Sequence, residues 1–396
     1  MANLESLPPA DFYDYESLLS GPERAKLAQL REFLAAEVLP HAVHWWNDAE
    51  FPAHILPKLA ALELSAPDRG RFSHLFSGLV VAEMTRADTS LATFFLVHHD
   101  LFVQALHDFG TAEQKARVLP DALALRSTGA FALTEPEHGS DVAGGMVTTA
   151  RRVEDDGGVH WVVNGAKRWI GNGTFCDHML LWARDADTRQ VRGFILDATL
   201  PGVTRTKIEH KIALRTVQNA HIELDNVRIA ERDRFAGIGS FGDTNKLLLG
   251  SRISVAWQAV GQQLAAFDVA RAYALERLQF GRPLARFQLI QGQLVKMLGN
   301  ATASLGMMVR IAGLQDRGGE ADATMGQVAL AKAHTTAAMR ETVALGRSIL
   351  GGNGIVTDFA MAKIFADAEA ILTYEGSHEI NTLIAGRAIT GVSAIV

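Results

Sequence analysis

Hydrophobic residues recur at helical spacing through the first third of the chain. The spacing begins after Pro22, a residue type that suits the first turn of a helix. Four aliphatic residues then follow at intervals of three or four positions: Leu27, Leu30, Leu34 and Val38. The segments 55–64 and 75–86 and the apolar block 91–97 extend this pattern. Together they predict an N-terminal helical domain over residues 1–127.

The pattern changes near Thr128, where Gly, Thr, Asn and β-branched residues become frequent. The alternating run 159–163, followed by Asn164 and Gly165, predicts a strand that runs into a tight turn. Short apolar runs at 179–182, 194–196 and 221–224 predict further strands, with turn formers such as Leu200-Pro201-Gly202 between them. These features predict a middle β domain over residues 128–238.

Helical spacing returns after Gly242. Five large apolar residues fall on one face of the first long segment: Ile253, Trp257, Val260, Leu264 and Phe267. Three further helices are predicted over 288–314, 325–350 and 379–388, which makes residues 239–396 a C-terminal four-helix bundle. The predicted fold class is therefore α+β, with a helical domain, a β domain and a helical bundle in that order. A chain of 396 residues has room for two or three such domains.

Composition and charge narrow the classes of function. The chain is 48% hydrophobic and 21% charged with a net charge of −6, which is typical of a soluble globular protein and argues against nucleic acid as the main partner. One cysteine, Cys176, excludes an internal disulfide framework, and the sequence has no compact His and carboxylate cluster that predicts a metal site. We find neither a run of eighteen apolar residues nor a basic leader before an apolar core. We therefore expect a cytoplasmic protein without membrane insertion.

Two stretches in the middle domain combine turn formers with groups that can bind a ligand. The loop 131–141 contains Thr134 and Ser140, and it is either a plain turn or a loop whose amides and hydroxyls hold a pyrophosphate-like group. In the run 167–173, Trp169 stands between two basic residues and Gly-Asn-Gly. Its indole is either a core side chain at a strand end or a cover for a flat aromatic ligand.

The C-terminal part contains three comparable stretches. The run 277–283 is either a helix stop or an arginine directed at a phosphate, with a phenylalanine beside an aromatic ring. The glycine-rich break 350–354 is weak evidence when taken alone. In 373–379, Ser377 suits a helix N-cap, and Glu375 lies just before the cap beside a glycine, where it can face a cavity.

In this order and spacing, the stretches resemble the acyl-CoA dehydrogenase family over essentially the whole chain. The phrases Leu-Gly-Gly-Asn-Gly-Ile, Thr-Tyr-Glu-Gly-Ser-His, Gly-Arg-Ala-Ile-Thr-Gly and Arg-Trp-Ile-Gly-Asn are most similar to glutaryl-CoA dehydrogenases and the related plant short-chain acyl-CoA oxidases. The resemblance implies FAD as cofactor and α,β-dehydrogenation of a short-chain acyl-CoA to the trans-2-enoyl-CoA. It also implies electron-transfer flavoprotein as electron acceptor and a homotetramer built as a dimer of dimers.

The resemblance implies roles for individual positions. Glu375 matches the catalytic base, which removes the α-proton while flavin N5 takes the β-hydride. The positions that match substrate contacts are Ser140, Arg252, Tyr374 and Gly376. Those that match FAD contacts of the same site are Phe131, Leu133, Thr134, Gly139, Ser140, Trp169, Ile170, Gly171, Ser377 and Glu379. Those that match FAD contacts from a neighbouring subunit are Arg277, Phe280, Gln288, Ser348, Ile349, Leu350, Gly351 and Gly352.

The chemistry of this reaction explains why a carboxylate is needed. The α-proton of a thioester becomes removable when donors stabilise the developing enolate oxygen, and the family uses for this the backbone N–H of the base and a ribityl hydroxyl of FAD. A carboxylate in a dry pocket has a raised pKa and is a better base at neutral pH. Some relatives carry the base just before the arginine matched by Arg252. Here that position is Ser251, which cannot act as a base, and this favours Glu375.

Two departures from the family pattern affect the predicted chemistry. Gly171 replaces a Thr or Ser whose hydroxyl lies near flavin N5, and the plant oxidases have the same glycine, so we expect raised reactivity with oxygen. By-eye alignment places Ala92 where glutaryl-CoA dehydrogenases carry an arginine for the distal carboxylate, which favours a neutral short acyl chain. A shifted alignment would let Arg86 supply that charge. His98 and His99 are either satisfied core histidines, which we favour, or polar wall residues.

Three alternatives remain open from the sequence alone. The first rival to the predicted dehydrogenase is a short-chain acyl-CoA oxidase that uses oxygen. The second is a decarboxylating glutaryl-CoA dehydrogenase, and the third is a catalytically silent acyl-CoA-binding protein on the same fold. The presence of Glu375 and of the full set of FAD motifs argues against the silent protein.

Overall fold

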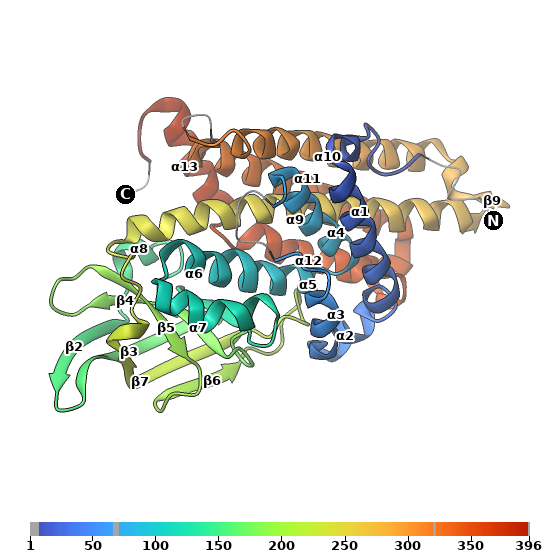
Figure 1. Ribbon diagram of the computed structural model, residues 1–396. Coiled ribbons are helices and arrows are strands. Elements are labelled where there is room, and N and C mark those ends of the chain that lie inside the picture. Colours follow the sequence, from blue (N-terminus) through green and yellow to red (C-terminus); the bar gives the residue numbers. More distant parts are fainter. Residues whose placement is uncertain (1–7, 66–70, 320–321, 395–396) are drawn as a thin grey trace.

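The computed structural model describes residues 8–65, 71–319 and 322–394, and it confirms the predicted order of helices, β sheet and helices (Figure 1). Short 3₁₀ and π segments are labelled η. The N-terminal elements are η2 (Tyr15–Leu18), α1 (Gly21–Phe33), η3 (Leu34–Val38), α2 (Ala42–Asp48), η4 (Ala53–Ile55), α3 (Leu56–Ala60), α4 (His74–Ala87), α5 (Thr89–Phe95), η5 (Leu96–Val103), α6 (Gln104–Phe109) and α7 (Ala112–Leu123).

The helix predicted after Pro22 is α1, and its first turn explains where it begins. The Ser20 hydroxyl accepts a hydrogen bond from the Glu23 amide, and the Glu23 carboxylate accepts one from the Ser20 amide at 3.0 Å. This reciprocal capping box satisfies amides that the helix itself leaves unpaired. The segment predicted at 55–64 is helical only as far as Ala60.

The middle part is a seven-stranded sheet in the order β1-β4-β2-β3-β7-β6, with β5 paired to β4. The strand β1 runs parallel to β4, whereas β2 and β3 form an antiparallel pair. The elements are β1 (Gly129–Ala132), α8 (Val142–Gly145), β2 (Thr149–Asp155), β3 (Gly158–Ile170), β4 (His178–Asp185), β5 (Val191–Asp197), β6 (Val203–Lys207), β7 (Ala220–Ala230) and η6 (Glu231–Asp233).

The tight turn predicted at Asn164 and Gly165 is wrong. The strand β3 continues through both residues, and its pairing with β7 shifts register between Val163 and Gly165. Gly165 has a φ of 146°, and a Cβ there would lie 2.6 Å from the Thr148 hydroxyl, so the position requires glycine in a β-bulge rather than in a turn. The Asn164 side chain accepts a hydrogen bond from the amide of Asn226 at 2.8 Å, which holds the bulge against β7.

The C-terminal part is helical, as predicted. Its elements are α9 (Phe241–Glu276), β8 (Leu278–Gln279), β9 (Arg282–Pro283), η7 (Leu284–Arg286), α10 (Gln288–Gln315), α11 (Met325–Leu350), η9 (Gly351–Ile355), η10 (Thr357–Phe359), α12 (Met361–Thr373) and α13 (His378–Thr390). The sequence prediction missed α12, although Met361, Ile364, Ala368 and Ile371 are buried at helical spacing. This omission matters because α12 leads directly to Glu375.

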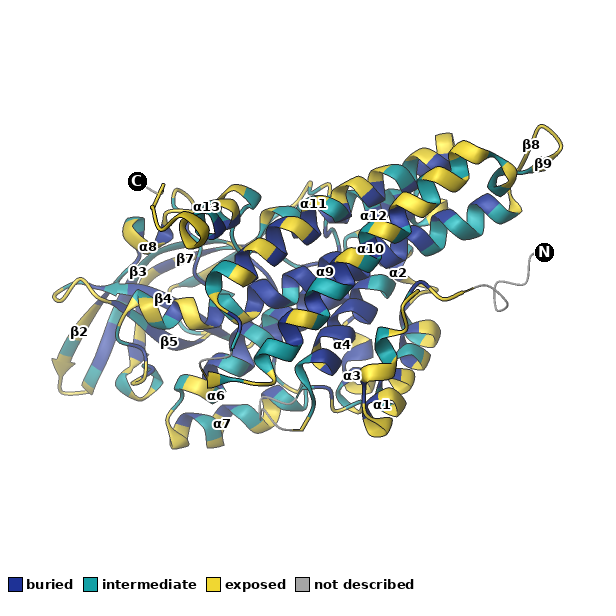
Figure 2. Ribbon diagram, turned by 90° about the horizontal axis from the view of Figure 1, so that it is seen from above, coloured by how far each residue is buried: buried dark blue, intermediate teal, exposed yellow. Residues whose placement is uncertain are grey.

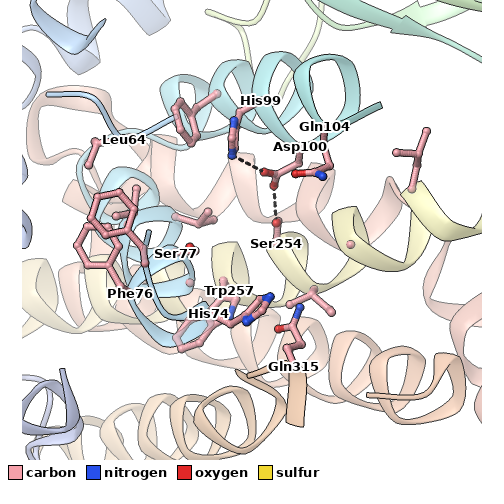
Figure 3. Close-up of a pocket in the computed structure, with 18 of the residues that line it drawn as sticks. Leu64, His74, Phe76, Ser77, His99, Asp100, Gln104, Ser254, Trp257 and Gln315 are labelled. Carbon is pink, nitrogen blue, oxygen red and sulfur yellow. Dashed lines mark hydrogen bonds and ion pairs between the residues drawn. The ribbon is translucent and has the colours of Figure 1, made fainter. Parts of the chain in front are cut away.

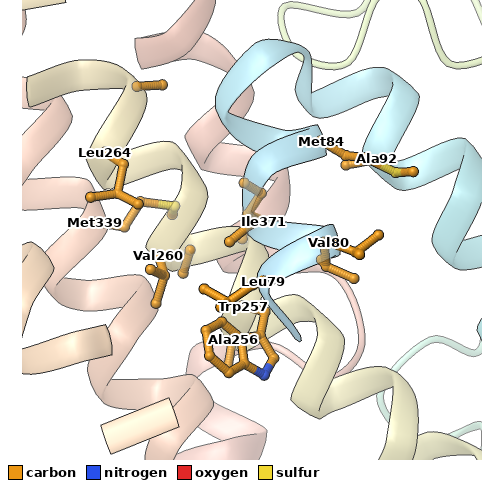
Figure 4. Close-up of a cluster of buried hydrophobic side chains, with 14 of the residues drawn as sticks. Leu79, Val80, Met84, Ala92, Ala256, Trp257, Val260, Leu264, Met339 and Ile371 are labelled. Carbon is orange, nitrogen blue, oxygen red and sulfur yellow. The ribbon is translucent and has the colours of Figure 1, made fainter. Parts of the chain in front are cut away.

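The helix α9 is the centre of the molecule and packs against both helical regions. Figure 4 shows Leu79 of α4 next to Trp257 of α9, Met84 of α4 next to Ala92 of α5, and Ile371 of α12 between these two groups. A Cβ at Gly78 would lie 2.0 Å from the Trp257 ring, so α4 and α9 cross closely at this glycine. The predicted apolar face of α9 is therefore confirmed as core.

The far end of the helical region projects away from the β sheet (Figure 1). There α9 ends at a hairpin, β8–β9, whose tip residues Phe280 and Gly281 have φ values of 52° and 75°, as in a type I′ turn. The Phe280 ring is 93% exposed, and Figure 2 shows the hairpin as an exposed tip beyond the helices. Within the described residues, no helix has the length and apolar character needed to cross a bilayer.

Candidate active site

Glu375 lies in the short link between α12 and α13. Its φ is 55° and that of Gly376 is 83°, so two successive residues adopt left-handed backbone conformations. Such a conformation is costly for glutamate and persists only where the surroundings enforce it. The carboxylate accepts a hydrogen bond from the Ser251 hydroxyl of α9 at 2.6 Å, and the carbonyl of Glu375 accepts one from Arg252 Nε at 3.2 Å. The predicted base and the predicted substrate arginine therefore meet.

The surroundings of this carboxylate favour its neutral form. Burial raises the pKa of Glu375, and the nearby carboxylate of Asp100 raises it further, whereas Ser251, Arg252 and Lys332 oppose the shift. Removal of a weakly acidic proton at neutral pH requires a base with such a raised pKa. Ser251 was not expected to act as a base, and nothing in the local sequence indicates the hydrogen bond that its hydroxyl donates to Glu375.

Beside the base, a buried polar network connects three helical segments. The Tyr374 hydroxyl donates to Gln258 Oε1 at 2.7 Å and lies 3.3 Å from the Thr93 hydroxyl, and Gln258 Nε2 donates to the same Thr93 hydroxyl at 3.2 Å. Burial raises the pKa of Tyr374, so the phenol stays protonated. The network places α5 next to the link that carries Glu375.

Hydrogen bonds connect the two predicted stretches of the middle domain, 131–141 and 167–173. Lys167 donates to the carbonyl of Leu133 at 3.0 Å and to the Glu135 carboxylate at 2.8 Å, and the Arg168 amide donates to the carbonyl of Thr134 at 2.8 Å. Glu135 in turn accepts from the amides of Val147 and Thr148. These bonds shape the loop after β1. The lysine of the Lys-Arg-Trp run is thus wholly buried and does not face a ligand.

Trp169 lies one residue before the end of β3, at a second irregularity of the β3–β7 pairing, with a φ of 64° and 54% of its surface exposed. An exposed indole held in a strained backbone suits stacking on a ring from outside the chain. Two residues later, a Cβ at Gly171 would lie 3.1 Å from the Val97 side chain. Val97 lies one helical turn after Thr93, so Gly171 approaches the helical segment whose Thr93 contacts Tyr374.

A second set of predicted cofactor residues lies elsewhere. Arg277, Phe280 and Gln288 are exposed at the far end of the helical region. The glycine-rich turn 351–354 joins them there, because the Asn353 side chain donates to the Tyr273 hydroxyl at 2.9 Å. Ser348, Gly351 and Gly352 are exposed, whereas the side chains of Ile349 and Leu350 are buried in the core. Of this set, Arg277 at the end of α9 is about 38 Å from Arg252 along the helix.

The remaining predicted positions have defined surroundings. Leu133 and Ile170 are core residues, with Phe131 partly buried beside Trp182, whereas Gly139 and Ser140 are exposed on the loop. Ser377 caps α13 through the amide of Ile380, as its position predicted, and Glu379 is exposed in the first turn of that helix.

Comparison with known proteins agrees with these features over the whole chain. Residues 22–126, 130–227 and 241–390 match the N-terminal, middle and C-terminal domains of acyl-CoA dehydrogenases. The chain belongs to the acyl-CoA dehydrogenase family. An acyl-CoA dehydrogenase of Bacillus subtilis (strain 168) is 30% identical over 91% of this chain and 96% of its own. The mitochondrial short-chain specific acyl-CoA dehydrogenase of Mus musculus is 30% identical over 89% of this chain and 86% of its own.

Solved structures extend the comparison to the fold. The crystal structure of glutaryl-CoA dehydrogenase from Mycobacterium smegmatis has a TM-score of 0.92 at 32% identity, with 98% of this chain and 100% of that chain covered. A glutaryl-CoA dehydrogenase from the same organism in complex with FADH2 also has a TM-score of 0.92, at 28% identity, covering 99% of this chain and 100% of that one. The chain is thus a member of a family of FAD-dependent oxidoreductases, and the exposed Trp169, Arg277 and Phe280 fit a flat, phosphate-bearing cofactor.

A separate crevice of about 160 Å³ lies between α4, η5 and α9 (Figure 3). One wall of the crevice is the side of α9 that carries Gly250, Ser254 and Trp257. Arg252 projects from roughly the opposite side of this helix. None of the predicted site residues lines this crevice. Within it, the Ser254 hydroxyl donates to Asp100, and burial raises the pKa of Asp100 to about 6.

The two histidines beside Asp100 differ. His98 is buried, its Nδ1 accepts from the amide of Gly129, and its Nε2 contacts the carbonyl of Ala122, so it is the satisfied core histidine that the sequence favoured. His99 lines the crevice and lies 2.7 Å from the Ser65 hydroxyl, so for this residue the preference for a core role was wrong. Burial lowers the pKa of both rings to about 4, so both are neutral at pH 7.

Replacement of Asp100 by Asn is expected to move the acid limb of the pH–rate profile to lower pH. The charge of Asp100 raises the pKa of Glu375, and Asn removes that charge while it still accepts from Ser254. The positive charges of Arg252 and Lys332 act on Glu375 in the opposite direction and remain in place. The measurement is kcat/KM against pH. An unchanged acid limb would show that the carboxylates are not coupled.

Proposed function

We propose that this protein removes hydrogen from the α and β carbons of a short, uncharged acyl-CoA, with Glu375 as the base. The observation that carries this proposal is the state of Glu375. Its carboxylate has a raised pKa, it is held by Ser251, and the left-handed backbone of the residue is fastened by Arg252. The amide N–H of Glu375 has no acceptor among the described residues. A base with an unused N–H at its own backbone suits a thioester, whose oxygen gains charge as the α-proton leaves.

The residues around the site have separate roles in the removal of the α-proton. Glu375 accepts the α-proton, and its own N–H stabilises the developing oxygen charge. Arg252 holds the backbone of the base, and Tyr374 with its buried partners keeps water away from one side of it. FAD, when bound, supplies the acceptor for the hydride that leaves the β-carbon. We assign Trp169 and the loop that includes Thr134 and Ser140 to hold this cofactor, with Leu133 as a packing residue beneath them.

Two observations support an uncharged acyl group. Ala92 is buried within α5, and Arg86, the other candidate for pairing with a distal carboxylate, already pairs with Asp268 and Glu83. A carboxylate would remain unpaired next to Ala92, which is costly in a buried site. The likeness to glutaryl-CoA dehydrogenases favours the decarboxylating alternative, so glutaryl-CoA is included in the test below.

The two separated sets of cofactor residues support a homo-oligomer. Arg277 is about 38 Å from Arg252 along α9, and Phe280 and the turn 351–352 lie at the same far end, too far to reach a cofactor beside Glu375 of the same chain. We propose that they contact the FAD of a neighbouring subunit in a homotetramer built as a dimer of dimers. Analytical ultracentrifugation of the flavoprotein tests this assembly, and a monomer that retains FAD would exclude it.

The test of function is a flavin-bleaching assay. Purified flavoprotein is mixed anaerobically with butyryl-CoA, isobutyryl-CoA, octanoyl-CoA and glutaryl-CoA, and air is then admitted. We expect rapid bleaching with the short neutral thioesters, and reoxidation in air that Gly171 accelerates but that stays slow beside bleaching, as for an enzyme that passes electrons to electron-transfer flavoprotein. Fast recovery of the flavin with formation of peroxide would establish the oxidase alternative. Bleaching by glutaryl-CoA alone would establish the decarboxylating alternative. A colourless protein that FAD cannot reconstitute would favour a silent acyl-CoA-binding protein.

Reactivity with oxygen is expected to depend on Gly171. A threonine at this position would restore the hydroxyl that most of the family has, but its Cβ would crowd Val97 at 3.1 Å. The change is therefore best made in a Val97→Ala background, with Val97→Ala alone as the control. Gly171→Thr should then lower the peroxide formed per reduced flavin. Equal peroxide yields from the two proteins would refute a role for Gly171 in oxygen reactivity.

A further inference from the structure

Side-chain donors bind every backbone carbonyl of the link 374–377. Lys332 Nζ of α11 donates to the carbonyls of Tyr374 at 2.6 Å and Gly376 at 2.5 Å. Asn381 of α13 donates to those of Gly376 and Ser377 at 2.8 and 3.0 Å. With Arg252 on the carbonyl of Glu375, all four carbonyls are turned toward donors on surrounding helices.

The bond from Lys332 to Tyr374 has a direct consequence for the base. The carbonyl of Tyr374 and the amide N–H of Glu375 belong to the same peptide group, and in a trans peptide they point in opposite directions. A donor that fixes the carbonyl therefore fixes the direction of the N–H. The second bond of Lys332, to the carbonyl of Gly376, ties the peptide group before Glu375 to the peptide group after Gly376, so the two cannot rotate independently.

We propose that Lys332 is the positioning residue that aims the Glu375 N–H at the thioester oxygen. This inference rests on the proposed function and identifies which side chain outside the substrate site prepares the oxyanion donor. A cation on the carbonyl end of a peptide group also polarises that group and strengthens the hydrogen bond donated by its N–H. Lys332 thus orients the donor and makes it stronger without touching the substrate.

The burial and the hydrogen-bond acceptors of Lys332 support a specific role for this residue. It is 1% exposed in the middle of a helical core, where an aliphatic side chain would avoid the cost of burying a cation. Burial lowers the pKa of Lys332 to about 7 even though Glu375 and Glu379 oppose that shift, and Arg252 lowers it further. Its direct hydrogen-bond acceptors are the two carbonyls that flank Glu375.

The test compares Lys332→Met, Lys332→Arg and the wild type, with Lys296→Met as a control on the exposed side of α10. The first readout is calorimetric binding of 3-oxobutyryl-CoA, an acidic thioester that can bind as its enolate, and of CoA itself. We expect Lys332→Met to bind the enolisable thioester about 10- to 100-fold more weakly, because loss of one oxyanion donor costs about 10²- to 10³-fold in rate. Affinity for CoA should stay within about twofold, and Lys332→Arg should recover part of the loss.

The second readout is the pH dependence of flavin reduction by the thioester that bleaches the wild type best. Lys332→Met should lower the maximal rate about 100-fold with a small change in KM. It should also move the acid limb to higher pH, because the charge of Lys332 lowers the pKa of Glu375. The shift of the acid limb reports the loss of the charge alone, whereas a merely structural role would leave the ratio of the two affinities unchanged.

Each outcome decides between the proposals. If Lys332→Met binds both ligands and reduces flavin as the wild type does, the inference fails and the proposed function stands. If no thioester bleaches the wild type, the proposed function fails and the inference fails with it. If Lys332→Met does not fold, Lys332→Gln, which keeps a neutral donor, replaces it. Equal enolate affinity in the Gln and wild-type proteins would then overturn the role of the cation.

Discussion

Glu375→Gln is expected to lower the rate of flavin reduction by acyl-CoA about 10²- to 10⁴-fold while FAD stays bound. The amide keeps the size of the side chain and can still accept from Ser251, whose hydroxyl lies 2.6 Å from the carboxylate. It cannot accept the α-proton. The N–H of residue 375 remains in place, so affinity for a non-reacting CoA thioester should change little. Stopped-flow absorbance of the flavin band measures the reduction rate, and the visible spectrum measures the bound FAD.

A matched control is available on the preceding helix. Glu369→Gln makes the same chemical change on α12, where the carboxylate pairs with Arg340 at 2.8 Å and is partly exposed. It should reduce flavin at the wild-type rate. If Glu375→Gln retained FAD and was reduced as quickly as this control, Glu375 would not be the base, and the reaction would need another acceptor for the proton.

Short continuous motifs explain why Glu375 could be singled out as the candidate base from sequence. Glu375, Ser377 and Trp169 each belong to a motif of fewer than ten consecutive residues. The groups that tune Glu375 come from separate helices: Ser251 from α9, Lys332 from α11 and Asp100 from η5. Their local sequences do not predict that they lie near Glu375, because this proximity depends on which helices pack together.

In the fold, too, local patterns predicted single elements but not the features that depend on long-range pairing. Amphipathic spacing identified α9 and α11, and α11 has the predicted bounds of 325–350. The tight turn predicted at Asn164 and Gly165 was wrong because the same pair of residues also suits a β-bulge. Only the pairing of β3 with β7 distinguishes a turn from a bulge here. The contact of Arg277 and Phe280 with a second subunit is what the resemblance implied and remains a proposal, and the length of α9, which their local motif does not encode, supports it. The cytoplasmic location and the domain boundaries remain predictions.

A buried ion network on α12 holds the three parts of the chain together. Lys363 pairs with Asp88 at 2.8 Å and with Asp367 at 3.0 Å, and all three residues are at most 3% exposed. Asp88 also caps α5 through the amide of Leu91. Asp367 accepts from the indole of Trp46 and from the amide of Leu214 in the middle domain. The network therefore links α5, α2 and the β domain to the helix that leads to Glu375.

Lys363→Met is expected to destabilise the protein by about 3–5 kcal/mol, the cost of removing one partner of a buried ion pair. Methionine has a similar shape, so the loss comes mainly from the two carboxylates left without a cation. The two carboxylates raise the pKa of Lys363 above its usual range, which is the sign expected of a lysine stabilised by its partners. Urea denaturation of the flavoprotein, at fixed protein and FAD concentrations, measures the change as a lower midpoint.

Two further variants separate charge from packing. Lys296→Met removes an exposed lysine that lies 3.2 Å from Glu341, and it should cost less than about 1 kcal/mol. The triple variant Lys363→Met, Asp88→Asn, Asp367→Asn removes the cation and both anions together, and Asn can still accept from the Leu91 and Leu214 amides through its side-chain oxygen. It should be more stable than Lys363→Met alone, because uncompensated buried charge costs more than a missing ion pair. If the triple variant were the less stable of the two, the loss would arise from packing around position 363, and the charges would not be what holds α12 in place.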